Sequence, residues 1–403
     1  MVNRKIAILV GDGMADYPIG ELGDKTPLQY TDTRHMDYLA KNGICGLAHT
    51  VPHGMPPGSD VANLSLFGYD PVQCYTGRAP LEALNMGIEL GPDDVAFRCN
   101  IVTIDNAIMK DFSADHIDSA FTKIVIDELA QQIQLKDIEF YAGVSYRNIV
   151  VIRHFTGDMP VTTPPHDIQG QAVNDYLPMG DNSKLLNDIM KQASEVIAHS
   201  KVITEAKTRY RGNPTAIWLW GGGFKPTMEP LSKRFGLYGF TISAVDLIHG
   251  IGKAAGLSPI YVEGATGYID TNYDGKAAAL IEAMNRANFV FLHVEAPDES
   301  GHEGNLEHKL KAIEDFDAKI VGPVVNMLNR YGEFTVLVMP DHPTPLNLRT
   351  HTGEPVPFVI YSPDINYRLQ CNGFNEVDAK ATGIVVDCAH TLLAMMVNNS
   401  FPW

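Results

Sequence analysis

Near-continuous runs of apolar residues lie at three well-separated places in the chain: Lys5–Val10, Ala287–Glu295 and Phe334–Met339. Strands without in-and-out alternation are typical of sheets that are buried on both faces. Between the last two runs, Leu306–Arg330 places apolar residues at every third or fourth position, which predicts a helix. Strands separated by helices predict an α/β fold in which helices sandwich a mostly parallel sheet.

The middle of the chain has a different pattern, with helix-like and strand-like runs but no acidic residues at strand ends. These runs are Phe121–Gln132, Tyr146–Arg153 and Ser183–Ser200. We therefore expect residues 95–210 to form a smaller α+β domain inserted into a core made of residues 1–94 and 211–403. The apolar run Ala216–Trp220 is expected to mark the point where the core resumes.

Composition narrows the classes of partner. The chain has 403 residues, with 31 Lys and Arg against 48 Asp and Glu, a formal charge of −17. No basic run interrupts this balance, so nucleic acid and anionic membranes are poor partners. No stretch approaches 18 apolar residues, so no transmembrane helix is expected. The five cysteines include no CxxC pair, a pattern typical of reduced thiols in a cytoplasmic protein. An acidic protein that handles an anion needs metal ions or a few placed arginines.

Acidic and imidazole side chains follow the predicted strands. Asp298 and His302 are spaced four apart, Asp341 and His342 are adjacent after a strand, and Asp12 ends the first strand. The carboxyl ends of parallel strands meet at one edge of a sheet, which is where chemistry collects in α/β folds. Either motif alone could arise by chance, but together with the loop residue His351 they indicate a dinuclear site. Imidazole and carboxylate without thiolate suit Mn²⁺, Zn²⁺ or Mg²⁺.

Ser59 is the candidate nucleophile. It follows a rigid Pro-Pro-Gly turn and precedes a run with helical spacing, so it is expected at or near a helix N-terminus. Free backbone N–H groups at that position favour a phosphoryl group. An ordinary N-cap serine is the alternative.

The chain resembles the archaeal-type cofactor-independent phosphoglycerate mutases of the alkaline phosphatase superfamily. The resemblance rests on collinear blocks that cover nearly the whole chain, among them GDGMADYP, PPGSDVANLSLFGYDP, YTGRAPLEA, GATGYIDTNYDGKA, VEAPDESGHEG and THTGEPVPF. It implies an alkaline-phosphatase-like core with an inserted substrate domain. It also implies a metal-dependent phosphotransferase, acting on a small phosphorylated metabolite, that interconverts 3-phosphoglycerate and 2-phosphoglycerate through a phosphoserine.

The resemblance assigns roles to the candidate residues by the motifs that they occupy. One metal ion, Mn²⁺ in preference to Zn²⁺ or Mg²⁺, would be held by Asp12, Ser59, Asp341 and His342. The second would be held by Asp298, His302 and His351. Ser59 would carry the phosphoryl group.

One departure from the family pattern leaves an alternative open. In the archaeal mutases the corresponding block contains three arginines and resembles a binding site for phosphate and carboxylate. The segment Lys110–Ser119 of this chain contains no arginine. Other blocks resemble a bacterial subgroup proposed to act as homoserine kinase, so a kinase of that type remains an alternative. The candidate substrate contacts that remain are Arg78, Arg98, Arg147, His166 and Lys225. The sequence leaves the donor, the acceptor, the native metal and the oligomeric state open.

Overall fold

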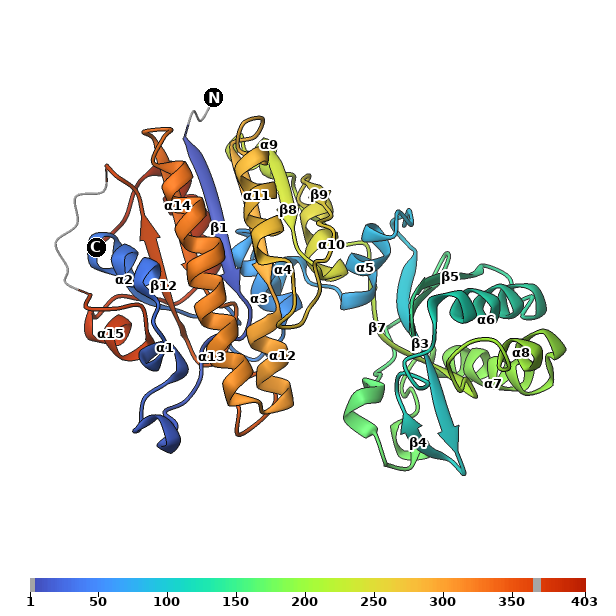
Figure 1. Ribbon diagram of the computed structural model, residues 1–403. Helices are drawn as coiled ribbons and strands as arrows, with labels where there is room; N and C mark the ends of the chain where they lie inside the picture. The colour runs from blue at the N-terminus through green and yellow to red at the C-terminus, as the bar shows by residue number, and fades with distance from the viewer. Residues whose placement is uncertain (1–3, 365–370) are drawn as a thin grey trace. The chain divides into compact units, whose positions relative to one another are not determined.

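A computed structural model describes residues 4–364 and 371–403. The chain divides into two compact units. The first unit combines the chain up to Tyr75 with Met228–Trp403, and the second comprises Thr76–Thr227. We describe each unit by itself (Figure 1).

The first unit is built on an eight-stranded sheet with the order β13-β2-β12-β11-β1-β10-β8-β9. The strands are β1 (Lys5–Gly11), β2 (Ile44–Ala48), β8 (Gly239–Ile242), β9 (Ser258–Ile260), β10 (Phe289–Val294), β11 (Phe334–Met339), β12 (Val356–Tyr361) and β13 (Val385–Val386). All neighbours pair in parallel except β12, which runs antiparallel to both β11 and β2. The central strands are buried along their length, as expected of a sheet covered on both faces.

Helices cover both faces of this sheet. Its helices are α1 (Pro27–Tyr30), α2 (Arg34–Asn42), α3 (Ser59–Leu66), α4 (Pro71–Cys74), α9 (Leu231–Phe235), α10 (Asp246–Ala254), α11 (Tyr273–Ala283), α12 (Ala296–Glu303), α13 (Leu306–Asp315), α14 (Gly322–Leu328), α15 (Glu376–Ala381) and α16 (Leu392–Asn398). Helices α2, α11, α13 and α14 share one apolar core with β1, β10 and β11. On the other face, Phe67 at the end of α3 stacks on Phe291 of β10, with ring centroids 4.0 Å apart. The predicted α/β architecture is confirmed.

The helix expected over Leu306–Arg330 is interrupted. A π-helical turn, Phe316–Val321, separates α13 from α14. Pro323 lies in the first turn of α14 and has no N–H to donate, so the regular ladder of hydrogen bonds cannot continue through this point.

The second unit contains a five-stranded antiparallel sheet. Strand β3 pairs with β4, β6 and β7, and β6 also pairs with β5. Its strands are β3 (Val95–Asp105), β4 (Ile108–Asp111), β5 (Ile138–Val144), β6 (Arg147–Ile152) and β7 (Ala216–Phe224). Its helices are α5 (Arg78–Asn85), α6 (Ser119–Gln132), α7 (Ser183–His199) and α8 (Lys201–Ala206). Short 3₁₀ turns occupy Pro165–Ile168 and Val173–Tyr176.

The second unit extends beyond the segment 95–210 expected from the sequence, at both ends. Ala216–Trp220 does not mark the return to the core, because it forms most of β7 and pairs antiparallel with β3. An apolar run indicates burial but not the sheet that buries it. Helix α5 also belongs to this unit, where Ala79 and Ala83 pack on the sheet.

No helix of the described part of the chain is both long and apolar enough to cross a membrane.

Candidate metal centre

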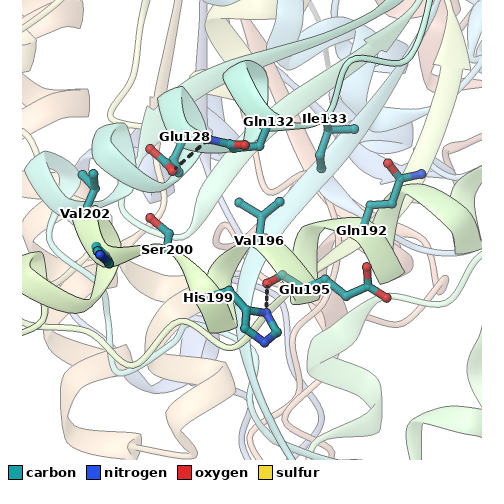
Figure 2. Close-up of a pocket in the computed structure, with 10 residues that line it drawn as sticks. Glu128, Gln132, Ile133, Gln192, Glu195, Val196, His199, Ser200 and Val202 are labelled. Atoms are coloured by element: carbon teal, nitrogen blue, oxygen red, sulfur yellow. Dashed lines mark hydrogen bonds between the residues drawn. The ribbon is translucent and has the colours of Figure 1, made fainter.

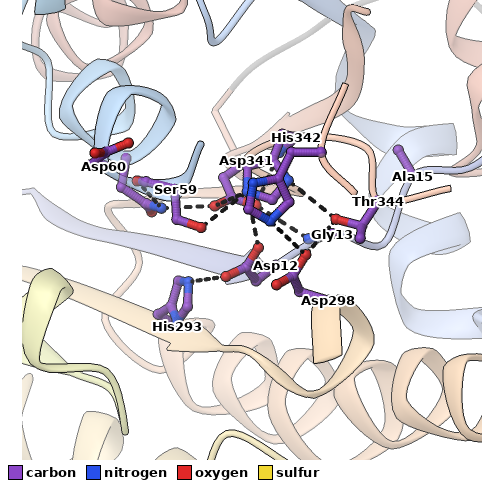
Figure 3. Close-up of polar contacts among 12 residues, drawn as sticks. Asp12, Gly13, Ala15, Ser59, Asp60, His293, Asp298, Asp341, His342 and Thr344 are labelled. Atoms are coloured by element: carbon purple, nitrogen blue, oxygen red, sulfur yellow. Dashed lines mark hydrogen bonds and ion pairs between the residues drawn. The ribbon is translucent and has the colours of Figure 1, made fainter. Parts of the chain in front are cut away.

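Three parallel strands bring the candidate residues together at their carboxyl ends. Strand β1 lies between β10 and β11, so the segments that follow all three strands meet at one edge of the sheet. Asp12 follows β1, Asp298 lies in the first turn of α12 directly after β10, and Asp341 with His342 follows β11 (Figure 3). The pairing of the strands thus brings Asp12 and Asp341 together, although they are more than 300 positions apart in the sequence.

A first group of potential ligands consists of Asp12, His293 and Asp341. Their ligand atoms lie within 4.8 Å of one another, and all three side chains are buried. His293 Nε2 lies 3.1 Å from Asp12 Oδ2. Burial, and then the nearby charges of Asp341 and Asp298, raises the pKa of Asp12 well above its usual range. Crowded carboxylates of this kind would be stabilised by a cation.

A second group surrounds Asp298. Its carboxylate lies 3.3 Å from His302 Nε2 and 3.4 Å from His351 Nε2, and the two Nε2 atoms are 2.9 Å apart. Burial opposes the charge of Asp298, but hydrogen bonds from His302 and His351 hold its pKa well below the usual range. The three residues expected to share one metal ion therefore lie in mutual contact.

His342 lies between the two groups. Its Nε2 is 3.5 Å from oxygens of both Asp12 and Asp341, and its ligand atoms also come within 4.8 Å of those of Asp298 and His351. The family resemblance implied that His342 shares a metal ion with Asp12 and Asp341, and in the structure His342 lies near both groups.

Ser59 is the first residue of α3 and faces this cluster (Figure 3). Its Oγ lies 3.0 Å from His342 Nε2. Asn63, one turn further along α3, donates hydrogen bonds to the Ser59 carbonyl at 2.9 Å and to Asp341 Oδ2 at 2.8 Å. The helix thus connects Ser59 to the carboxylate expected to share its metal ion. Asn63 was not identified from the sequence.

The donor set fits divalent metal ions. Three buried carboxylates and four imidazoles converge here, and Asp12 Oδ1 and His293 Nε2 have no hydrogen-bond partner in the described chain. Buried polar atoms are normally satisfied, so orphaned atoms at this edge need another partner. Oxygen and imidazole donors together suit Mn²⁺ or Zn²⁺, and carboxylate oxygens suit Mg²⁺.

A buried lysine fixes the loops that carry these residues. Lys309 Nζ donates to Asp16 Oδ2 at 2.8 Å, to the Thr344 carbonyl at 2.8 Å and to the Ala15 carbonyl at 3.4 Å. The Thr344 hydroxyl donates to Asp298 Oδ1. One ammonium group therefore ties the loop after β1 to the loop after β11.

Three of these residues were not identified from the sequence. His293 is a polar residue inside the apolar strand β10, and that position is its only sequence signal. Lys309 lies on a helix whose spacing gives no sign that an ammonium group is buried. Thr344 follows the Asp-His pair by two positions, and its role depends on the fold of the loop.

The candidate substrate residues belong to the second unit. Glu82 pairs with Arg78 Nε and Arg98 Nε, each at 2.9 Å, and the Arg98 guanidinium stacks on Trp220 at 4.3 Å. Burial lowers the pKa of Arg98 to about 10, a value at which it remains charged at neutral pH. This cluster therefore contains two arginines and one glutamate, so its positive charges outnumber its negative charge.

The remaining three candidates are related to this cluster to different degrees. Arg147 stacks on Tyr146 at 5.4 Å and is close enough to help lower the pKa of Glu82, although burial opposes the Glu82 charge. The His166 ring is 5.4 Å from that of Trp220. Lys225 is exposed after the end of β7, and the structure records no contact between it and the cluster.

A cavity of about 580 Å³ lies elsewhere in the second unit, between α6 and the helices α7 and α8 (Figure 2). Polar side chains, among them Glu128, Gln132 and Glu195, line much of it, and His199 Nδ1 lies 2.8 Å from the Glu195 carbonyl oxygen. None of the metal or substrate candidates is among its lining residues, so size alone does not identify the functional site.

Comparisons with known proteins identify the family of the chain. A family model described as 2,3-bisphosphoglycerate-independent phosphoglycerate mutase matches residues 40–202. A probable 2,3-bisphosphoglycerate-independent phosphoglycerate mutase of Geobacter sulfurreducens is 49% identical over 98% of this chain and 100% of that protein. The 2,3-bisphosphoglycerate-independent phosphoglycerate mutase of Methanosarcina acetivorans is 49% identical over 98% of this chain and 99% of that protein. The solved structure of the PH0037 protein from Pyrococcus horikoshii covers 100% of both chains with a TM-score of 0.81 and 27% identity.

Proposed function

Since the chain belongs to the 2,3-bisphosphoglycerate-independent phosphoglycerate mutases, we propose that it interconverts 3-phosphoglycerate and 2-phosphoglycerate through a phosphoserine at Ser59. The observation that carries the proposal is the position of the Ser59 hydroxyl. It lies at a helix N-terminus and 3.0 Å from His342, inside a cluster of buried carboxylates and imidazoles. This arrangement supports covalent transfer of a phosphoryl group.

The residues divide into two proposed metal-binding groups. Asp12, Asp341, His342 and Ser59 would hold one ion, and Asp298, His302 and His351 the other. Bound Mn²⁺, or Zn²⁺ or Mg²⁺ in its place, would neutralise phosphate charge and lower the pKa of the serine hydroxyl.

The transfer itself occurs between oxygen atoms. Ser59 Oγ attacks phosphorus, the bond from phosphorus to the 3-oxygen of glycerate breaks, and that oxygen takes up the proton that serine gave up. The 2-hydroxyl of the same glycerate then attacks the phosphoserine, which returns the phosphoryl group and restores the serine hydroxyl. The sum is an isomerisation that consumes no water.

Helix α3 contributes directly to phosphate binding. Gly58 is its N-cap residue and has no side chain that could cap the first N–H groups. The Val61 N–H donates to Asp60 Oδ1 at 2.9 Å, and the other N–H groups of the first turn, with the positive end of the helix dipole, favour a phosphoryl group on Ser59. Asn63 keeps Ser59 and Asp341 in register.

The arginine cluster supports a second part of the proposal, that Arg78, Arg98 and Arg147 bind the anionic groups of the substrate. Glu82 neutralises one of the two arginines with which it pairs, and Arg147 adds further positive charge nearby. This cluster would compensate for the absence of arginine in Lys110–Ser119.

The test is an assay of the purified protein with Mn²⁺ and 3-phosphoglycerate, without added 2,3-bisphosphoglycerate. A parallel reaction offers homoserine with ATP, the alternative that the sequence left open. We expect 2-phosphoglycerate in the first reaction and one phosphate on Ser59 by mass spectrometry. Ser59→Ala should lose several orders of magnitude of activity.

Ser65→Ala is the matched control on the same helix. Ser65 donates to the Thr50 carbonyl at 2.6 Å and does not contact the cluster, so this variant should lose some stability but retain turnover. Near-normal mutase activity of Ser59→Ala, or phosphate transfer to homoserine alone, would contradict the proposal.

A further inference from the structure

His293 is a buried imidazole whose role neither the family resemblance nor the sequence motifs assigned. It lies one residue before the end of β10 and pairs in register with Val10 of β1, so Asp12, two residues after Val10, is close to it. Its side chain is 1% exposed, and Figure 3 shows its ring directed at Asp12. Imidazole buried in an apolar strand needs partners for both nitrogens.

Only one nitrogen of His293 has such a partner. Nδ1 lies 3.3 Å from Ser243 Oγ, and that oxygen also accepts a hydrogen bond from the Val245 N–H at 2.9 Å. Nε2 lies 3.1 Å from Asp12 Oδ2, but the contact lacks the geometry of a hydrogen bond, and Nε2 has no hydrogen-bond partner in the described chain. A lone pair on Nε2 directed at a cation would account for both observations.

We propose that His293 binds a divalent metal ion through Nε2, together with Asp12 and Asp341. Its Nδ1–H then donates to Ser243 Oγ, which fixes the tautomer and the ring orientation, as is usual for histidines that bind metal ions. The inference deepens the proposed function and rests on its metal dependence.

The chemistry of this position changes with a second imidazole ligand. Asp12, Ser59 and Asp341 supply hard oxygen donors, which Mg²⁺ accepts, and His342 supplies one nitrogen donor; a second nitrogen donor from His293 favours Mn²⁺ and, more strongly, Zn²⁺. Asp12, His293 and Asp341 then supply three protein ligands, and His342 remains near both groups of residues.

The competing role for His293 is that of a positioning residue which donates Nε2–H to Asp12 without touching the ion. Metal affinity alone does not separate the two roles, because loss of an orienting partner also weakens binding by roughly 10–100-fold. A direct reading of the Nε2 nitrogen does separate them.

The experiment uses the full chain with ¹⁵N-labelled histidine, loaded with ¹¹³Cd²⁺ as the probe. We expect a ¹¹³Cd–¹⁵N splitting on the Nε2 resonance of His293, identified by its loss in His293→Gln. The same variant should bind one of its cadmium ions more weakly than the wild type does. A His293 Nε2 that carries a proton in the loaded protein, with no cadmium splitting, would overturn the proposal.

His249→Gln is the matched control. His249 is also 1% exposed and lies close to Ser243, whose carbonyl oxygen is 3.0 Å from its Nε2, but it is not part of either ligand group. We expect it to retain the full cadmium stoichiometry. Should His293→Gln fail to fold, the single variants His302→Gln, His342→Gln and His351→Gln assign the other coupled nitrogens, and a fourth coupled resonance in the wild type is then that of His293.

The result is independent of the reaction. Cadmium splitting on His293 in a protein without mutase activity would support the metal ligand and reject the proposed function. Mutase activity in a protein whose His293 Nε2 is protonated would support the proposed function and reject His293 as a metal ligand.

Discussion

Replacing Lys309 with methionine should destabilise the first unit and weaken metal binding together. The ammonium group is fully buried and holds Asp16 Oδ2 and the Thr344 carbonyl, each at 2.8 Å. Methionine fills much of the same volume but leaves a carboxylate with 1% exposure without its counter-ion. Breaking a buried pair in this way costs about 3–5 kcal/mol, a large share of the ~5–15 kcal/mol that stabilises a typical protein.

The same change should reach the metal site through one residue. Thr344 accepts from Lys309 with its carbonyl and donates to Asp298 with its hydroxyl. Loosening this loop resembles the loss of an orienting partner, for which a 10–100-fold weaker metal affinity is an order-of-magnitude expectation.

Urea unfolding in EDTA measures the free energy of unfolding without metal. Hydrogen exchange of peptides from β1 and β11 then measures the local stability of these two strands. Metal affinity is measured separately by titration. Lys311→Met on the same helix is the control, because Lys311 is 52% exposed and its pair with Asp315 should contribute at most ~1 kcal/mol. Asp16→Asn added to Lys309→Met should recover part of the loss, since it removes the unpaired charge. Equal destabilisation by the two lysine variants would refute the reasoning.

Three further results are expected. Burial lowers the pKa of His249 to about 4 from 6.5, so the unfolded chain binds the extra proton: the contribution of His249 to metal-free stability should be full above pH 6.5 and fall by about 3 kcal/mol toward pH 4, and His249→Gln should remove this part of the pH dependence in urea titrations, leaving that of His293. Gly13→Ala should lower the metal occupancy measured by mass spectrometry, because φ is +63° and a Cβ would lie 2.6 Å from Thr344 Oγ1. Arg98→Met should raise KM for 3-phosphoglycerate more than it lowers kcat, whereas Glu82→Gln, which keeps both cations, should not weaken substrate binding; steady-state kinetics decide both.

Local pattern determined much of the first unit. The continuous apolar runs became β1, β10 and β11, because a strand buried on both faces must be apolar throughout. The carboxylates that follow them could be predicted to meet, since parallel strands place their carboxyl ends on one edge. The ligand motifs around Asp298 and Asp341 were recognisable for the same reason.

Other features depended on contacts between distant segments. The run Ala216–Trp220 is as apolar as the core strands, yet it pairs with β3 in the second unit, because periodicity indicates burial and not the neighbouring strand. The partners of His293 and Lys309 come from loops far away in the sequence. Burial of a histidine or a lysine is tolerable only where such partners exist, and only the packed tertiary structure supplies them.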